Sequence, residues 1–284
     1  SAIVSVYNCE RFIRGCLEDL EQQTIADKLE IVVVNRGSQQ NEEPIIKEFQ
    51  AKYDNIVYIK TEERETIYKA WNRGIKASSG KYITNANTDD RHRKDAIEIM
   101  VNELEKDKDI SLVYYDFIVT DTENETFEKC TPVDYLNIPE FNRCQLLITG
   151  PCFGHQPMWR RNLHEKFGYL DETFEVAGDT EFWVRLAVSE CNFKHIKEYL
   201  SLYLRSPNSL ERRNSTTEIS EFIAIIERYM LKVGHSNKNL KGIKRIQSKE
   251  LFDLSYSCFQ KMQLCSARKA LFRSIKYNWL NFKS

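Results

Sequence analysis

Short runs of hydrophobic residues alternate with longer amphipathic stretches over the first 120 residues. Four runs are rich in β-branched or aromatic residues and are bounded by polar ones: AIVSV (2–6), LEIVVV (29–34), NIVYI (55–59) and GKYIT (80–84). A fifth run, ISLVYYDFIV, covers residues 110–119. Runs of this length and composition predict buried strands.

The stretches between these runs have helical spacing. Ile67, Trp71 and Ile75 recur every four residues and therefore share one face of a predicted helix. Alternating strands and helices predict an α/β fold with a doubly wound, mostly parallel sheet flanked by helices.

In such a sheet, ligands bind beyond the carboxyl ends of the strands. Three polar segments follow predicted strands there: YN (7–8), NRGS (35–38) and NTDD (87–90). We expect these three segments to converge on one crevice.

Beyond residue 120 the pattern is weaker. Residues 120–148 are polar and irregular, and residues 155–174 predict a turn, a short helix and a loop. A helix is expected from about 180 to 191, and a strand at 193–205.

The C-terminal part differs from the rest in pattern and in charge. From Glu218 the hydrophobic positions follow helical spacing, with Gly234 as the expected stop. Residues 238–284 carry eleven Lys and Arg against two acids, whereas the remainder carries 30 basic and 40 acidic residues. We therefore predict one domain over 1–214 and a basic helical C-terminal extension over 215–284.

Aromatic residues are interleaved with the basic residues of this extension. One hypothesis is attraction to an anionic membrane surface, which would place the protein peripherally at the inner face of the membrane. A nucleic-acid partner is not expected, because no recognition motif accompanies the charge. The alternative that we favour is a solvated helical cap.

Composition excludes several classes of protein. Of the 284 residues, 42% are hydrophobic and 29% are charged, and no hydrophobic run approaches the roughly 20 residues of a membrane span. The eight cysteines show no CxxC spacing, which argues against zinc and indicates free thiols in a reducing compartment such as the cytoplasm. Because the sequence opens directly on a strand, we expect it to be part of a longer multidomain chain.

Two adjacent carboxylates, Asp89 and Asp90, end the predicted strand at 80–84. Like charges at one site repel, so their proximity has to be offset. A hard divalent cation, Mg²⁺ or Mn²⁺, would do so and would keep positions open for phosphate oxygens. Capping of the following helix is an equally good interpretation of the spacing alone.

A third acid, Asp179, lies in AGDTEFWVRLA, where Phe182 and Trp183 would anchor a helix to the core. Taken alone, Asp179 is best explained as a helix N-cap. In GHQPMWRR, His155 and Trp159 either line a sugar or phosphate site or pack around a core tryptophan.

Several nucleotide-binding and hydrolytic motifs are missing. The sequence has neither a GxGxxG fingerprint nor a P-loop, so dehydrogenase and P-loop kinase functions lose their main support. It also has no GxSxG elbow.

Taken in order, the segments over about residues 1–205 resemble the inverting family-2 glycosyltransferases of the GT-A fold. The resemblance is carried by SAIVSVYNCERFIRGCLEDLEQQT, LEIVVVNRGS, AWNRGIKASSGKYITNANTDD, HEKFGYLDETF and GDTEFWVRLA. Each piece is weak alone, but the ordered combination is specific.

The resemblance implies roles for individual residues. Asp89 would be the principal ligand of a Mn²⁺ or Mg²⁺ ion on the diphosphate of a nucleotide sugar, UDP- or GDP-linked, with Asp90 beside it. Asp179 falls where the family has its catalytic base. The nucleotide contacts would be Tyr7, Asn8, Asn35, Asn72 and Asn87. The acceptor-side candidates are His155, Trp159 and Trp183.

This sequence also departs from the family pattern. The family usually has DDGS where this chain has NRGS, so Asn35 and Arg36 replace two acids. Asn87 replaces the first acid of the metal motif, Trp71 stands where an arginine is common, and Gly178 stands where a glutamate often precedes the base. Together these changes predict a weakened or unusual donor site.

The sequence therefore predicts a bacterial, metal-dependent inverting glycosyltransferase that moves a sugar from a nucleotide sugar to a hydroxyl acceptor in polysaccharide or glycoconjugate assembly. Two alternatives stay open. A nucleotidyltransferase would also use a metal beside a nucleotide but would not need Asp179. A non-catalytic module with a degenerate transferase fold would bind sugar or a partner without turnover.

Overall fold

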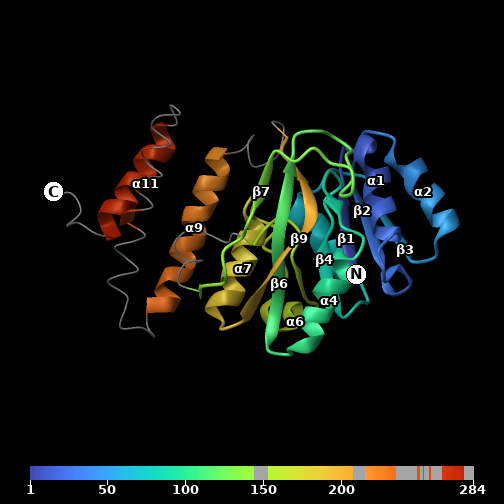
Figure 1. Cartoon of the computed structure of the whole chain (residues 1–284). Helices are drawn as coiled ribbons and strands as arrows, with labels where there is room; N and C mark the ends of the chain where they lie inside the picture. Colours follow the sequence, from blue (N-terminus) through green and yellow to red (C-terminus); the bar gives the residue numbers. More distant parts are fainter. Residues whose placement is uncertain are drawn as a thin grey trace. The chain divides into compact units, whose positions relative to one another are not determined.

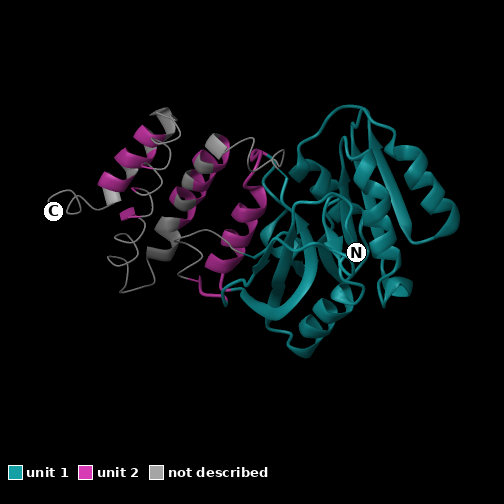
Figure 2. Cartoon of the chain, turned by 45° about the horizontal axis from the view of Figure 1, so that its top comes forward, with its two compact units in different colours: residues 1–140, 152–172, 191–207 teal, residues 141–151, 173–190, 208–284 magenta. Residues whose placement is uncertain are grey.

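The computed structural model describes residues 1–143, 153–206, 215–234 and 264–277, together with residues 248, 249, 252 and 256. The chain forms two compact units (Figure 2). Unit 1 comprises residues 1–140, 152–172 and 191–207, and unit 2 comprises residues 141–151, 173–190 and 208–284. The domain boundary expected at 214 stays a prediction.

Unit 1 is built on one mixed sheet with strand order β3-β2-β1-β4-β8-β6-β9-β5, and β7 pairs with β6 (Figure 1). The pairs β3-β2, β2-β1, β1-β4 and β6-β9 are parallel. The strands are β1 (Ala2–Val6), β2 (Ile31–Arg36), β3 (Ile56–Thr61), β4 (Tyr82–Asn85), β5 (Arg91–His92), β6 (Ile110–Thr120), β7 (Asp134–Leu136), β8 (Met158–Arg160) and β9 (Asn192–Leu204). The predicted α/β fold with a mostly parallel sheet is confirmed.

Helices cover both faces of this sheet. The helical segments of unit 1 are α1 (Glu10–Glu21), η1 (Ala26–Lys28), α2 (Glu42–Lys52), α3 (Ile67–Ala77), α4 (Ala96–Lys106) and α6 (Leu163–Phe167). Alternate residues of a strand point to opposite faces. Val4 and Val6 of β1 accordingly join the core under α1, α2 and α4, whereas Ile3 meets α3. A Cβ atom at Gly74 of α3 would lie 2.6 Å from Cγ2 of Ile3, so a glycine is needed for this close packing.

The main correction to the predicted elements concerns residues 155–174. Met158–Arg160 form β8, which is inserted antiparallel between β4 and β6. Three residues are too few for a strand period to emerge from the sequence. Trp159 in β8 is 1% exposed, so it packs in the core.

Unit 2 contains α7 (Gly178–Val188), α9 (Ser215–Gly234) and α11 (Leu264–Tyr277). The helix expected from about 180 to 191 therefore begins and ends slightly earlier. The helix expected from Glu218 to Gly234 is confirmed as α9.

A buried carboxylate joins α7 to α9. Glu181 is 2% exposed and accepts a hydrogen bond from the hydroxyl of Tyr229. Its carboxylate also pairs with Arg185 at 2.7 Å and with Arg228 at 3.4 Å. Buried charges are tolerated when they are paired and hydrogen-bonded in this way.

Much of the basic extension lies outside the described residues, so its proposed contacts stay predictions. Within the described ranges, none of the helices combines the length and the apolar character needed to cross a bilayer. Cys9, Cys16, Cys130 and Cys191 are free thiols, as expected for these four positions.

Candidate functional site

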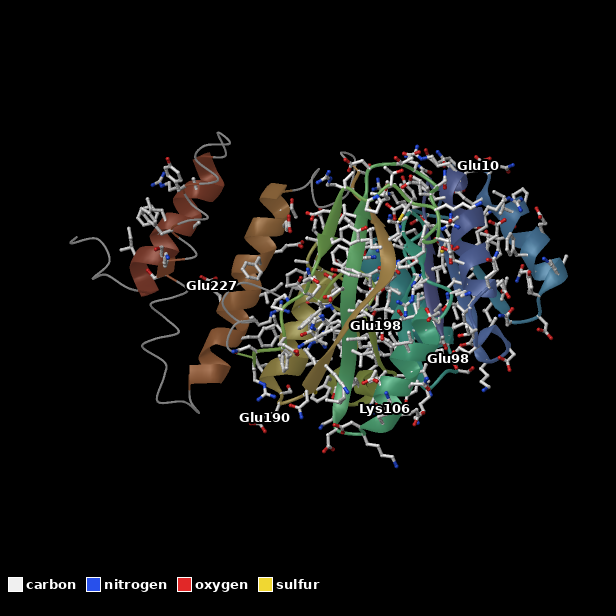
Figure 3. All side chains as sticks on the ribbon, viewed as in Figure 1. Glu10, Glu98, Lys106, Glu190, Glu198 and Glu227 are labelled. Atoms are coloured by element: carbon white, nitrogen blue, oxygen red, sulfur yellow. The ribbon has the colours of Figure 1, made fainter. Side chains whose placement is uncertain are left out.

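The loops that follow β1 and β2 are joined by a buried carboxylate. Glu42, which is fully buried, accepts hydrogen bonds from the backbone N–H of Cys9 at 2.7 Å and from the hydroxyl of Ser38 at 2.7 and 2.8 Å. Glu10, which Figure 3 labels at the start of α1, also takes part. Its carboxylate accepts a hydrogen bond from the backbone N–H of Asn41 at 3.2 Å. The loops after β1 and β2 therefore lie together, and the expected convergence of these two with residues 87–90 on one crevice stays a prediction.

Asn8 and Asn35 lie at the ends of β1 and β2, next to the loops that Glu42 joins. Asn8 has a φ of 51°, its Oδ1 accepts a hydrogen bond from the backbone N–H of Gln39, and its own backbone N–H donates to the hydroxyl oxygen of Ser38. Asn35 is 3% exposed, accepts from the backbone N–H of Ser38 at 2.9 Å, and donates to the hydroxyl of Tyr58. Both amides thus fix the loop geometry, and their contacts with a nucleotide stay predictions.

Asn72 connects α3 to the segment that follows α6. Its amide nitrogen donates to the carbonyl oxygen of Leu170 at 2.8 Å and to Oε1 of Glu172 at 2.9 Å, while its Oδ1 accepts from the N–H of Leu170. An amide has two N–H donors, and both have protein partners here. These bonds favour a positioning role for Asn72 over direct contact with a nucleotide.

The two adjacent carboxylates do not cap a helix. The N-cap of α4 is Asp95, and Asp89 and Asp90 instead precede the short strand β5. Asp90 is 2% exposed, and its oxygens accept bonds from the backbone N–H of Leu204 at 3.1 Å and the amide of Asn87 at 2.9 Å. Neither residue therefore caps α4, and two hydrogen bonds fix the orientation of the Asp90 carboxylate.

The environment of the Asp89 carboxyl disfavours its ionised form. Its burial, and then the negative charge of Asp90, raise its pKa to about 7. A bound cation would reverse this effect, because a nearby positive charge favours the ionised carboxylate. No group of three or more His, Cys, Asp or Glu side chains in the described ranges is arranged to hold a metal. A pair of hard oxygen donors fits Mg²⁺ or Mn²⁺, since these ions take further ligands from water and substrate phosphates.

Two buried histidines lie near the carboxylate pair: His92 follows Asp90 by two residues, and His155 lies beside Asp90. His155 has Nε2 at 3.0 Å from the hydroxyl of Ser201 and 3.7 Å from Oδ2 of Asp90. Burial lowers the pKa of both His92 and His155 to about 3, so both rings are neutral at pH 7. A neutral, largely buried His155 therefore lies beside Asp90 without adding charge to the site.

Asp179 lies in the first turn of α7, in unit 2. The helix begins at Gly178 with Ala177 as its N-cap, so Asp179 is not the cap. Its Oδ1 accepts from the N–H of Thr180 at 2.7 Å. A carboxylate in the first turn is stabilised in its ionised form by the helix dipole. The capping explanation for Asp179 is therefore wrong as well.

The segment before Asp179 is held by α9. The Glu221 carboxylate accepts bonds from three successive backbone N–H groups, those of Glu175 at 2.6 Å, Val176 at 2.9 Å and Ala177 at 2.7 Å. The role of Glu221 could not be predicted from the sequence, because its hydrogen-bond partners lie more than 40 residues away. No local spacing signals such a contact.

The aromatic acceptor candidates are buried. Trp159 donates its indole N–H to Nε2 of His164 at 2.8 Å, in the core of unit 1. Trp183 is 4% exposed and packs against Phe182 in unit 2. For Trp159 the structure shows the core alternative that the sequence left open. His155 is also largely buried, with 10% of its side chain exposed, and its contact with an acceptor stays a prediction.

Comparisons with known proteins bear on the family and the fold. A family model described as Glycosyl transferase family 2 matches residues 1–168, more than half of the chain. An uncharacterised glycosyltransferase of Methanocaldococcus jannaschii is 27% identical over 241 residues, which cover 84% of this chain and 80% of that protein. Chondroitin synthase of Pasteurella multocida is 25% identical over 240 residues, which cover 84% of this chain but 24% of the synthase.

Two solved structures have a similar fold at low identity. TarS of S. aureus (residues 1–349, in complex with UDP-GlcNAc) matches with a TM-score of 0.73 and 15% identity, covering 97% of this chain and 80% of that one. Mannosyltransferase PcManGT of Pyrobaculum calidifontis, in complex with GDP-Man and Mn²⁺, matches with a TM-score of 0.58 and 13% identity, covering 99% and 87%. The expected GT-A fold is thereby confirmed.

Proposed function

Because this chain belongs to glycosyl transferase family 2 and is therefore a glycosyltransferase, we propose that it transfers a sugar from a nucleotide-sugar donor to a hydroxyl acceptor, with inversion at the anomeric carbon. The acceptor belongs to a growing polysaccharide or glycoconjugate. We place the reaction in the cytoplasm, and we propose the basic extension as the part that meets a membrane-bound acceptor. The base of the donor is left open by the similar structures, since one contains UDP-GlcNAc and the other GDP-Man.

One observation carries this proposal. Asp89 and Asp90 lie side by side after β4, cap no helix, and leave the Asp89 carboxyl with a pKa raised to about 7. These residues would hold a Mg²⁺ or Mn²⁺ ion, which when bound supplies positive charge to the donor diphosphate. Asp90 would be held in orientation by Asn87 and Leu204, so that Asp89 is the ligand that adapts to the cation.

The transfer itself is assigned to Asp179. Its carboxylate accepts the proton of the acceptor hydroxyl as that oxygen forms a bond to the anomeric carbon. The bond from the anomeric carbon to the diphosphate oxygen breaks on the opposite side, and its electron pair leaves with the nucleoside diphosphate. A general base of this kind has to be ionised, a state that the first turn of α7 favours.

Calorimetric titration tests the donor site. We expect one of UDP, GDP, CMP and dTDP to bind the wild-type chain in the presence of Mn²⁺, and binding to be lost without Mn²⁺ and in Asp89→Ala. A donor-sugar screen then follows, in which Asp179→Asn binds nucleotide normally but transfers no sugar. Absence of nucleotide binding under every condition would contradict the proposal and favour a non-catalytic module. Release of pyrophosphate from a nucleoside triphosphate would favour a nucleotidyltransferase.

A further inference from the structure

The first turn of α1 carries an exposed arginine that pairs with a carboxylate from a distant loop. Nη2 of Arg11 lies 3.0 Å from Oε1 of Glu123, and the two side chains are 59% and 46% exposed. Glu123 belongs to the loop that follows β6. Ion pairs between exposed side chains contribute little to stability, because water solvates both charges well when they are apart. Arg11 can therefore exchange this partner for a stronger one at little cost to the fold.

Arg11 lies on the face of α1 that packs against the segment containing Asp89. Arg11, Gly15 and Asp19 recur every four residues, so they share one face of the helix. Asp19 pairs with Arg91 at 2.6 and 2.8 Å, and a side chain at Gly15 would collide with the guanidinium of the same arginine. Arg11 lies one turn nearer the start of the helix, on the side of the residues that precede Arg91.

The start of α1 also contacts the residue before Asp89. The thiol of Cys9, the N-cap of the helix, hydrogen-bonds with the side chain of Thr88. Burial and a neighbouring carboxylate raise the pKa of the Asp89 carboxyl, whereas the charge of Arg11 lowers it and that of Glu123 raises it. The pair of Arg11 and Glu123 therefore lies within electrostatic reach of the carboxylate that would hold the cation.

The loop that presents Glu123 is closed at its base. The Glu125 carboxylate accepts hydrogen bonds from the hydroxyl of Thr120 at 2.5 Å and from the backbone N–H of Thr131 at 3.0 Å. Asn124 has a φ of 61°, in the left-handed region that tight turns use. Because these contacts fix the loop, only the exposed side chain of Glu123 has to turn away to release its partner.

We propose that Arg11 binds the diphosphate of the donor, and that Glu123 takes the place of this diphosphate when no donor is bound. The inference rests on the proposed function, since it concerns the same donor site. A nucleoside diphosphate carries more negative charge than one carboxylate and offers several oxygens to the fork of a guanidinium. Arg11 therefore leaves Glu123 for the donor. Negative charge that builds on the leaving diphosphate strengthens the same contact.

Calorimetry on the full chain with Mn²⁺ tests this assignment. The probe is whichever of UDP, GDP, CDP and dTDP binds wild type most tightly, compared with its monophosphate. Arg11→Met should weaken binding of the diphosphate at least about tenfold, because a charge-assisted hydrogen bond is lost, and should reduce the preference for diphosphate over monophosphate. Glu123→Gln removes the competing charge and should tighten binding of the diphosphate about two- to fivefold. This gain should disappear in the double variant.

A neighbouring ion pair on the same helix provides the matched controls. Arg14 holds Glu48 through two hydrogen bonds, at 2.9 and 2.6 Å, and both side chains are exposed. Arg14→Met and Glu48→Gln should leave binding within about twofold of wild type, because they change charges outside the proposed site. Circular dichroism checks that all variants are folded.

Four results would overturn the inference. Unchanged binding in Arg11→Met would refute it while leaving the proposed function intact. An equal loss for diphosphate and monophosphate in that variant would show that Arg11 does not recognise the diphosphate. Binding in Glu123→Gln no tighter than in wild type would show that Glu123 does not compete with the donor. Failure of every nucleotide to bind wild type with Mn²⁺ would refute the proposed function together with this inference.

Discussion

The contact between Glu221 and the segment before α7 allows a quantitative prediction. Oε1 of Glu221 accepts from the N–H of Glu175, and Oε2 accepts from those of Val176 and Ala177. Glu221→Gln keeps one acceptor oxygen and turns the other into an NH₂ group that faces N–H donors. At least one charge-assisted hydrogen bond is lost, and each such bond contributes about 1.5–3 kcal/mol.

This loss should appear as easier local opening of the segment. A change of 1.4 kcal/mol corresponds to a factor of ten, so amide hydrogen exchange at residues 175–177 should accelerate by about 10- to 150-fold in Glu221→Gln. Since Asp179 follows directly, kcat should fall while the affinity for nucleotide stays unchanged. Exchange is measured by mass spectrometry on peptides that cover 173–182.

The matched control is Glu227→Gln, which removes a carboxylate from the same helix but none of the three bonds (Figure 3). Its exchange at 175–177 should match that of wild type. Unchanged exchange in Glu221→Gln would show that the three hydrogen bonds do not hold the segment, and the reasoning would then be wrong.

Two further predictions concern ionisable groups. In the metal-free protein, His92 and His155 have pKa values lowered to about 3, so as the pH falls from 6.5 to 5.5 both side chains take up protons in the unfolded chain but not in the folded one. With an unfolded histidine pKa of about 6.5, the two together lower the free energy of unfolding by about 2 kcal/mol over this pH unit, and Asp89, with its folded pKa raised to about 7, offsets about 1.2 kcal/mol of that. The free energy of unfolding should therefore fall by about 0.8 kcal/mol; urea unfolding in EDTA checks this, and a flat or rising profile would contradict it. Burial and the hydrogen bond to Glu181 raise the pKa of Tyr229 to about 12, so the stability contributed by its neutral form should be lost as pH rises from about 10 to 12. Tyr229→Phe should remove one absorbance titration at 295 nm with a midpoint near pH 12, and should lower the unfolding free energy at pH 7 by about 1–3 kcal/mol because a buried carboxylate loses a donor.

The elements that sequence analysis predicted well are those with a local signal. β1, β2 and β6 are mostly hydrophobic, because strands covered on both faces bury the side chains of successive residues. β8 was missed, because Met158–Arg160 is paired by its neighbours β4 and β6 and has no periodic pattern of its own.

The features of the site also divide into those that the sequence shows locally and those that depend on the fold. The adjacency of Asp89 and Asp90 is visible in the sequence, but only the fold shows that neither residue caps α4. The positions of Arg36 and Arg64 beside the ring of Tyr7 depend on the close approach of two loops. Contacts between residues far apart in the sequence leave no local spacing, so no pattern could predict them.

Unit 2 is discontinuous in the sequence, and this has a consequence for how the chain is made. Residues 173–190 leave the ribosome between two segments of unit 1, whereas α9 follows about 25 residues after α7 ends. Until α9 emerges, the Glu181 carboxylate lacks the hydroxyl of Tyr229, and the N–H groups before α7 lack Glu221. A nascent chain that stops at residue 214 would therefore carry the Asp179 segment without the groups that order it. We expect such a shortened protein to retain the sheet of unit 1 and to lose sugar transfer.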